Sequence, residues 1–143
     1  MAQQNPEFTK GDVLDGWIVS MVAEAEVSKN MILELGTAYP QVVKHTTTTT
    51  TAVLGVALDD ASADGLVAVL VFGPIKKLIS DSSGITRGHL AISSDATAGS
   101  IEGKAYADGG TLYGCVGVAL DTADAAGELV PVICGWPGMV AMS

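Results

Sequence analysis

Two histidines and the carboxylates of two acidic turns are the residues of this chain best suited to chemistry. His45 and His89 stand alone, outside the HxH and HExxH spacings in which histidines bind metals. The carboxylates also lack the DxDxDG spacing of a calcium loop. These patterns favour turn caps and half-buried or surface histidines, and they predict no metal site. The turn carboxylates are Asp59, Asp60, Asp64, Asp121, Asp124 and Glu128.

Other catalytic and cofactor-binding patterns are missing from the sequence. It contains no GxSxG nucleophile motif and no GxxxxGK[ST] phosphate loop. Cys115 and Cys134 belong to strand-like segments without a CxxC pair, so buried thiols are favoured over a disulfide or metal pair. The sequence therefore predicts a protein that is not an enzyme and has no cofactor.

The chain is organised around a duplicated stretch, and such a repeat identifies the structural unit. Residues 55–73, GVALDDASADGLVAVLVFG, return 62 positions later at residues 117–135 as GVALDTADAAGELVPVICG. Short Val, Leu and Ile runs between Asp and Gly clusters predict a strand, an acidic turn and a second strand in each copy. A short helix at residues 59–64 or 121–126 is the alternative for the turns.

The strand predicted at residues 66–72 is apolar on both alternating faces. A strand with one solvated face would alternate apolar with polar residues, so this strand is either sandwiched between layers or packed against another subunit. The candidates for an oligomer interface are Leu66, Val67, Val69, Val71, Leu129 and Ile133. Pro131 takes the place of Val69 in the second copy, which predicts an edge or a bulge there, because proline cannot donate to the ladder.

The rest of the chain predicts further short strands. They fall at residues 17–22, 31–35, 39–45 and 90–93, with a hairpin over 104–116. The threonine run 46–51 predicts a strand or a solvated loop. Residues 27–32 align with 85–90 at an offset of 58, which would extend the duplication upstream. No segment has a sustained helical period, so we expect an all-β fold, a small barrel or sandwich.

Charge and hydropathy limit the partners of the chain. Its 7 Lys and Arg against 16 Asp and Glu give a net charge of −9, which argues against nucleic acid and anionic membranes. The mean hydropathy of +0.41 suggests that a partner covers part of the apolar surface. No apolar run approaches the roughly 20 residues of a membrane helix. Residues 1–10 are polar and predict a flexible arm ahead of a single β domain at 11–143.

The repeated GVALD, acidic turn and apolar strand, with the preceding Ile-Thr-Arg-Gly-His-Leu of residues 85–90, resemble the head decoration, or capsid cement, proteins of tailed bacteriophages. The resemblance covers about residues 11–138. It implies a compact β-barrel or tulip-like subunit that often forms homotrimers. Such proteins bind the outer capsid surface at three-fold and quasi-three-fold positions and stabilise it. The resemblance brings no catalytic residues.

The resemblance also implies partners and a location. The chain would be made in the host cytoplasm and would contact the major capsid protein on the outside of the virion. In lambda-like members an N-terminal arm becomes ordered on the capsid and adds a strand to it, which is recognition by β-augmentation. The corresponding arm residues here are Ala2, Gln3, Gln4, Asn5, Pro6, Glu7, Phe8, Thr9 and Lys10.

Two other classes of function remain open from the sequence. A small β-barrel binding module, carbohydrate-binding or adhesin-like, would require a cluster of exposed aromatic residues. An enzyme would require His45 or His89 to meet carboxylates in a cleft.

Overall fold

A computed structural model of the chain describes residues 16–37, 42–49, 52–105 and 112–141, and the predicted arm lies outside these residues. The described residues form strands and loops without a helix, so the all-β prediction is confirmed and the helix alternative for the two turns is wrong. The strands are β1 (Trp17–Ala23), β2 (Ile32–Leu35), β3 (Val42–His45), β4 (Gly55–Ala57), β5 (Leu66–Ile79), β6 (Leu90–Ser93), β7 (Ile101–Lys104), β8 (Leu112–Ala119) and β9 (Leu129–Ala141).

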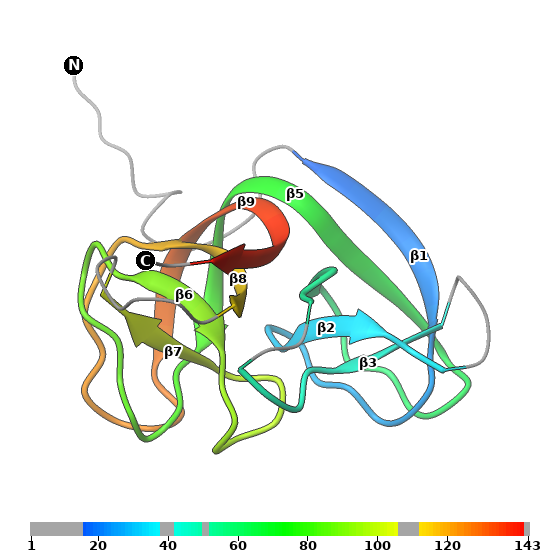
Figure 1. Cartoon of the computed structure of the whole chain (residues 1–143). Helices are drawn as coiled ribbons and strands as arrows, with labels where there is room; N and C mark the ends of the chain where they lie inside the picture. Colours follow the sequence, from blue (N-terminus) through cyan, green and yellow to red (C-terminus); the bar gives the residue numbers. More distant parts are fainter. Residues whose placement is uncertain (1–15, 38–41, 50–51, 106–111, 142–143) are drawn as a thin grey trace.

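The strands form one curled sheet in the order β1-β3-β2-β4-β5-β9-β8-β6-β7. An additional pairing between β1 and β5 closes the first five strands into a small barrel. We call the part before Pro74 the first lobe and the part after Gly73 the second lobe. Figure 1 shows β2 and β3 on one side of the molecule, β6 to β8 on the other, and β5 arching between them.

Strand β5 belongs to both lobes. Its first half pairs with β1 and β4, and its second half pairs with β9. In the first lobe β1 runs parallel to β3 at Val22–Val42, and in the second lobe Ser80, just after β5, makes a parallel bridge to Ile101 of β7. The end of β5 is therefore the structural equivalent, in the second lobe, of β1 in the first lobe. The long strand β5 belongs to both lobes and joins them without a linker.

The turn before β2 and the turn before β6 have the same backbone contacts. Val27 bridges Ala61 in the first lobe, and Ile85 bridges Ala123 in the second. In both turns the third residue after the bridge has a positive φ, 75° at Asn30 and 89° at Gly88. The upstream alignment at an offset of 58 thus corresponds to equivalent positions in the two lobes.

Two local predictions are wrong. Strands β7 and β8 do not form a hairpin, because β6 lies between them and pairs with both. Pro131 is neither in an edge strand nor at a bulge, because β9 lies between β5 and β8 and Pro131 pairs regularly with Lys77. Proline is tolerated here because the β8–β9 pairing ends at Ala119–Val132, one residue before Pro131 is reached. On that side only the Pro131 carbonyl takes part in a hydrogen bond, which it accepts from the Leu120 amide at 2.9 Å.

In the second half of each repeat, the structurally equivalent residues differ by one position from those that the sequence alignment pairs. Val56 pairs with Leu70, whereas its counterpart Val118 pairs with Ile133. The extra residue of the second turn lies between Ala123 and Gly127, because Gly127 has the positive φ and the backbone hydrogen bond that Asp64 has in the first turn. Pro131 then corresponds to Ala68 rather than to Val69. The buried Val67 and Val69 of β5 then match the buried Val130 and Val132 of β9.

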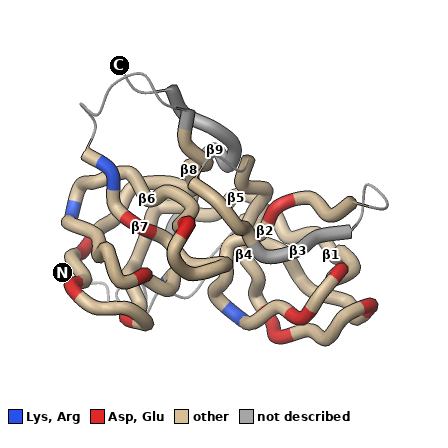
Figure 2. The backbone as a smooth tube through the Cα atoms, turned by 60° about the horizontal axis from the view of Figure 1, so that its bottom comes forward, with Lys and Arg blue, Asp and Glu red and all other residues tan. Residues whose placement is uncertain are grey.

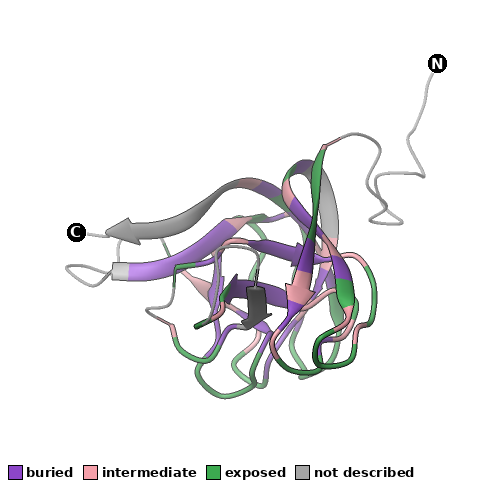
Figure 3. Ribbon diagram, turned by 90° about the vertical axis from the view of Figure 1, so that its right-hand side faces the viewer, coloured by how far each residue is buried: buried purple, intermediate pink, exposed green. Residues whose placement is uncertain are grey.

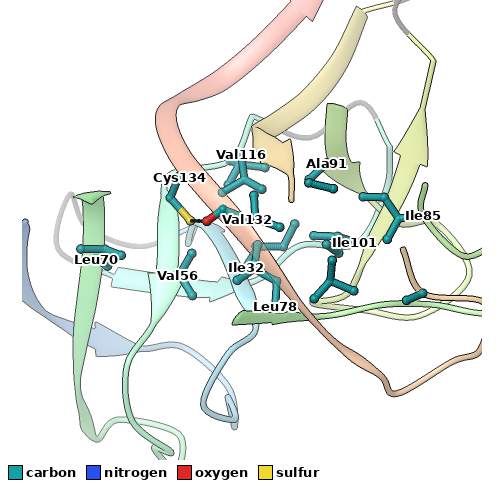
Figure 4. Packing of buried hydrophobic residues seen from close by; sticks show 14 residues of the cluster. Ile32, Val56, Leu70, Leu78, Ile85, Ala91, Ile101, Val116, Val132 and Cys134 are labelled. Atoms are coloured by element: carbon teal, nitrogen blue, oxygen red, sulfur yellow. Dashed lines mark hydrogen bonds between the residues drawn. The ribbon is translucent and has the colours of Figure 1, made fainter. Parts of the chain in front are cut away.

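The core has two main parts, seen as purple strands in Figure 3. A cluster inside the first lobe includes Val67 and Val69 of β5. A larger cluster fills the second lobe and continues into the junction with the first lobe, where it includes Ile32, Val56 and Leu70 (Figure 4). The middle strands of the first lobe are consequently buried on both faces.

Backbone hydrogen bonds also cross between the lobes. Gly99 of the second lobe accepts from the Ile32 amide at 2.9 Å and donates to the Thr46 carbonyl at 3.0 Å. The Gly114 amide donates to the Thr49 carbonyl at 2.7 Å. The described part of the threonine run, residues 46–49, is therefore a loop that the second lobe contacts.

Candidate interaction surface

The feature of the described surface that stands out is a band of exposed apolar side chains across the outer face of the sheet. The pairs Trp17–Phe72 and Val118–Ile133 place these residues on neighbouring strands β1, β5, β9 and β8. Trp17 is 74% exposed, Ile133 45%, Phe72 42% and Val118 40%. Several large apolar side chains exposed side by side on a soluble protein indicate an interaction site.

A shallow hollow of about 440 Å³ lies within this band, between the two lobes. Its described lining is mostly apolar, and none of the described residues around it carries a charge. The residues around it are Gly16, Trp17, Phe72, Gly73, Ile133, Cys134 and Gly135. Such a lining suits an apolar segment or protein face rather than a charged ligand.

The residues predicted for an oligomer interface fall into two groups. Leu66, Leu129 and Ile133 are exposed, at 74%, 50% and 45%. Val67 and Val69 are buried in the core of the first lobe, so these two cannot meet a neighbour without unfolding, and Val71 is partly buried against the same core. The exposed aromatic pair Trp17–Phe72 escaped the sequence analysis, because only the β1–β5 pairing brings the two residues together.

The acidic turns act mainly as caps for backbone amides. Asp60 accepts from the Lys29 amide at 2.7 Å, and Glu128 accepts from the Asp124 amide at 2.9 Å. Asp121 accepts from the next residue, Thr122, at 2.8 Å. Among the described acidic residues, drawn red in Figure 2, only Glu34 and Glu102 are in strands, and the others are in loops. The prediction of turn caps is confirmed for these three carboxylates.

The two histidines are in different lobes of the described structure. His45 is in β3, and His89 is half-buried in the turn before β6. His89 shares a small hollow of about 170 Å³ with Asp124, but its Nδ1 atom is buried there without a hydrogen-bond partner. Among the described residues, no three His, Cys, Asp or Glu side chains gather as a metal site.

The same part of the chain has no helix that is long and apolar enough to cross a membrane.

Cys115 and Cys134 are buried, and neither takes part in a disulfide, as predicted. The Cys134 thiol donates to the Val132 carbonyl and the Cys115 thiol to the Gly117 carbonyl, both at 3.7 Å. Burial raises the pKa of the Cys115 thiol, which keeps it protonated and unreactive.

A buried polar network organises residues 94–100, the loop that contacts the first lobe. The Asp81 carboxylate is fully buried and accepts hydrogen bonds from the Ser94 hydroxyl and, at 2.7 Å, from the Ser83 amide. The Ser94 hydroxyl oxygen in turn accepts from the Ala96 and Thr97 amides. This network escaped the sequence analysis because Asp81 looks like any other loop aspartate until the fold buries it.

Glu102 of β7 lies beside this network. Burial, and then the nearby charges of Asp81 and Asp95, raise the pKa of the Glu102 carboxyl from 4.5 to about 7. A raised pKa means that the folded protein binds this proton more tightly than the unfolded chain does. The resulting stabilisation is complete below about pH 4.5 and is lost as the pH rises to about 7.

We expect Glu102→Gln to be more stable than the natural protein at pH 8, by about 1 kcal/mol once solvent screening is considered. A neutral amide keeps the hydrogen-bonding capacity of the protonated acid without its charge. Thermal unfolding between pH 5 and 8 measures the effect, and Glu26→Gln, an exposed carboxylate, controls for the lost charge. Parallel pH profiles for the natural protein and Glu102→Gln would contradict this role.

Comparison with known proteins finds a similarity of structure. No protein-family model matches the chain, and no curated protein matches its sequence. Among solved structures, it is similar to the head fiber gp8.5 N base of bacteriophage phi29, with a TM-score of 0.62 and 18% sequence identity. The match covers 83% of this chain and 93% of the phage structure. The two proteins therefore share a fold across almost the whole of the phage base.

Proposed function

We propose that this chain is a structural virion protein that decorates and stabilises the outer surface of a tailed-phage head. It acts there as homotrimers at three-fold and quasi-three-fold sites and contacts the major capsid protein. The observation that carries the proposal is the fold shared with almost all of a phage head fiber base. The sequence pattern, which resembles capsid decoration proteins, points the same way by an independent route.

The surface is suited to such a role. It offers an uncharged apolar band for protein contacts, whereas the carboxylates lie mainly on loops (Figure 2). A net charge of −9 suits the outside of a particle, away from packaged DNA. In an oligomer, several modest contacts per copy add up to firm attachment.

The arm, residues 2–10, is the proposed contact with the major capsid protein. It is followed within a few residues by Gly16 and Trp17, which line the apolar hollow. A polar segment that orders itself on a capsid strand would add main-chain hydrogen bonds there. The hollow would then receive apolar side chains of the capsid next to the arm.

Deleting residues 1–10 is expected to reduce binding to expanded phage shells by at least about 100-fold while the melting temperature stays unchanged. The measurement is co-sedimentation of the protein with shells that lack it. A chain of equal length, with residues 2–10 replaced by glycine and serine, tests whether the arm sequence matters. Full occupancy by the deleted protein would exclude the arm as the contact.

The exposed Trp17 and Phe72 are the observation that favours a second function, a carbohydrate-binding module. Sugars that change the fluorescence of the natural protein but not that of Trp17→Ala would support it. If the full chain also failed to sediment with shells, this function would replace decoration.

A further inference from the structure

Two carboxyl side chains meet next to the loop of residues 94–100. The Asp81 amide donates to the Ile101 carbonyl at 2.9 Å, and Glu102 is the next residue of β7. Asp81 is fully buried, Glu102 is half-buried, and the two side chains share a hydrogen bond. A hydrogen bond between two carboxyl groups requires that one of them keeps its proton, because ionised carboxylates only accept. The pair is therefore intact only while it holds a proton.

The carboxyl pair is connected to the loop through Ser94. The Ser94 hydroxyl donates to the Asp81 carboxylate, and its oxygen accepts from the Ala96 and Thr97 amides. The Ser94 amide also donates to the Ser100 carbonyl at 3.0 Å, which closes the loop at its base. The shape of the loop backbone therefore depends on the hydrogen bonds that Asp81 and Ser94 make.

The same loop holds the two lobes together at one edge of their junction. Gly99 accepts from the Ile32 amide at 2.9 Å and donates to the Thr46 carbonyl at 3.0 Å. The approach is close, because a Cβ atom at Gly99 would lie only 2.8 Å from the Met31 Cγ. Ile32 itself belongs to the apolar cluster that spans the junction. A displacement of the loop would therefore break two hydrogen bonds between the lobes beside their shared core.

Three charged side chains of the described structure face Glu102. Asp81 and Asp95 are acidic, and Asp95 belongs to the loop itself, whereas Lys104 of β7 is the opposing base. Strand β6, which pairs with β7, has the uncharged sequence LAIS. When Glu102 ionises, like charges on β7 and on the loop repel each other. Burial and the two acidic neighbours raise the pKa of the Glu102 carboxyl to about 7, so this ionisation occurs near neutral pH.

We propose that the Asp81–Glu102 pair is a pH-sensitive switch for the contact between this loop and the first lobe. With the shared proton, the hydrogen-bond network is complete and Gly99 stays bonded to the first lobe. Without the proton, the two carboxyls separate, repulsion between Glu102 and Asp95 displaces the loop, and the bonds of Gly99 open while the strands of both lobes stay paired. The inference concerns contacts within one chain and does not rest on the proposed function.

Native-state amide hydrogen exchange of the full chain between pH 6 and pH 8 tests the switch. After correction for the intrinsic effect of pH on exchange, protection of the Ile32 and Gly99 amides should fall by about fivefold over this range, once solvent screening of the half-buried Glu102 is considered. Low concentrations of denaturant should leave this exchange unchanged, which distinguishes a local opening from global unfolding.

Three variants connect the opening to the carboxyl pair. Glu102→Gln should keep its protection across the pH range, because a neutral amide donates to Asp81 without adding a charge. Asp95→Asn should reduce the loss, because it removes one of the repelling charges from the loop. Glu26→Gln, at an exposed carboxylate of the first lobe, is the matched control and should show the full loss.

Three outcomes would overturn the switch. Exchange at Ile32 and Gly99 could be independent of pH in the natural protein. The same loss of protection could occur in Glu102→Gln. The two amides could also follow global unfolding in denaturant at every pH, which would show that the loop does not open by itself.

Discussion

Replacing Gly117 with alanine is expected to lower the free energy of unfolding by about 3 kcal/mol or more, a large part of the stability of a small domain. A Cβ atom at Gly117 would overlap the carbonyl oxygen of Ile133 and lie 2.8 Å from its carbonyl carbon and 3.2 Å from the Cys134 Cα. All three atoms belong to the backbone of β9. They cannot move aside as a flexible side chain could, so β8 and β9 would have to separate.

The same constraint applies in the other copy of the repeat. A Cβ at Gly55 would overlap the carbonyl oxygen of Leu70 and lie 2.9 Å from a Val69 methyl group. This close approach explains why both copies begin with glycine. Thermal or denaturant unfolding of Gly55→Ala and Gly117→Ala measures the cost. Gly135→Ala is the control, because a Cβ there meets no atom within 4 Å. Losses in the two variants no larger than the control's would show that the strands can relax.

Leu70→Ala is expected to cost about 3 kcal/mol, whereas Ile133→Ala, at the equivalent position of the second lobe, should cost less than about 1 kcal/mol in the monomer. Leu70 is 1% exposed in the cluster between the lobes, so alanine leaves a cavity there. Ile133 is 45% exposed, and its truncation opens no enclosed space.

Denaturant unfolding at low protein concentration and low salt isolates the monomer for this comparison. Val56→Ala and Val118→Ala form a second matched pair, with 0% and 40% exposure. The loss should again be larger in the first lobe. Equal losses in the two lobes would mean that Val118 and Ile133 are already covered within one chain.

The sequence by itself determined the repeating unit and its local chemistry. The GVALD strand, acidic turn and apolar strand pair as expected in both lobes, since neighbouring strands joined by a short turn meet through local contacts. The capping roles of Asp121 and Glu128 also follow from residue type, because carboxylates in turns bond to nearby amides, whereas Asp60 caps the amide of Lys29, 31 residues away. The arm and the capsid partner stay predictions from the resemblance.

Only the tertiary structure decided which strands become neighbours and which faces become buried. Strand β6 inserts between β7 and β8, and the extra residue between Ala123 and Gly127 moves Pro131 to the outer face. Asp81 becomes a buried acceptor, and the pKa of Glu102 rises because the fold buries that carboxyl and brings it beside Asp81. Val118 and Ile133 are the structural equivalents of Val56 and Leu70 and are similarly apolar, yet they are exposed. Hydrophobic pattern specifies that a face is apolar, but whether another body covers it depends on contacts between residues far apart in the chain.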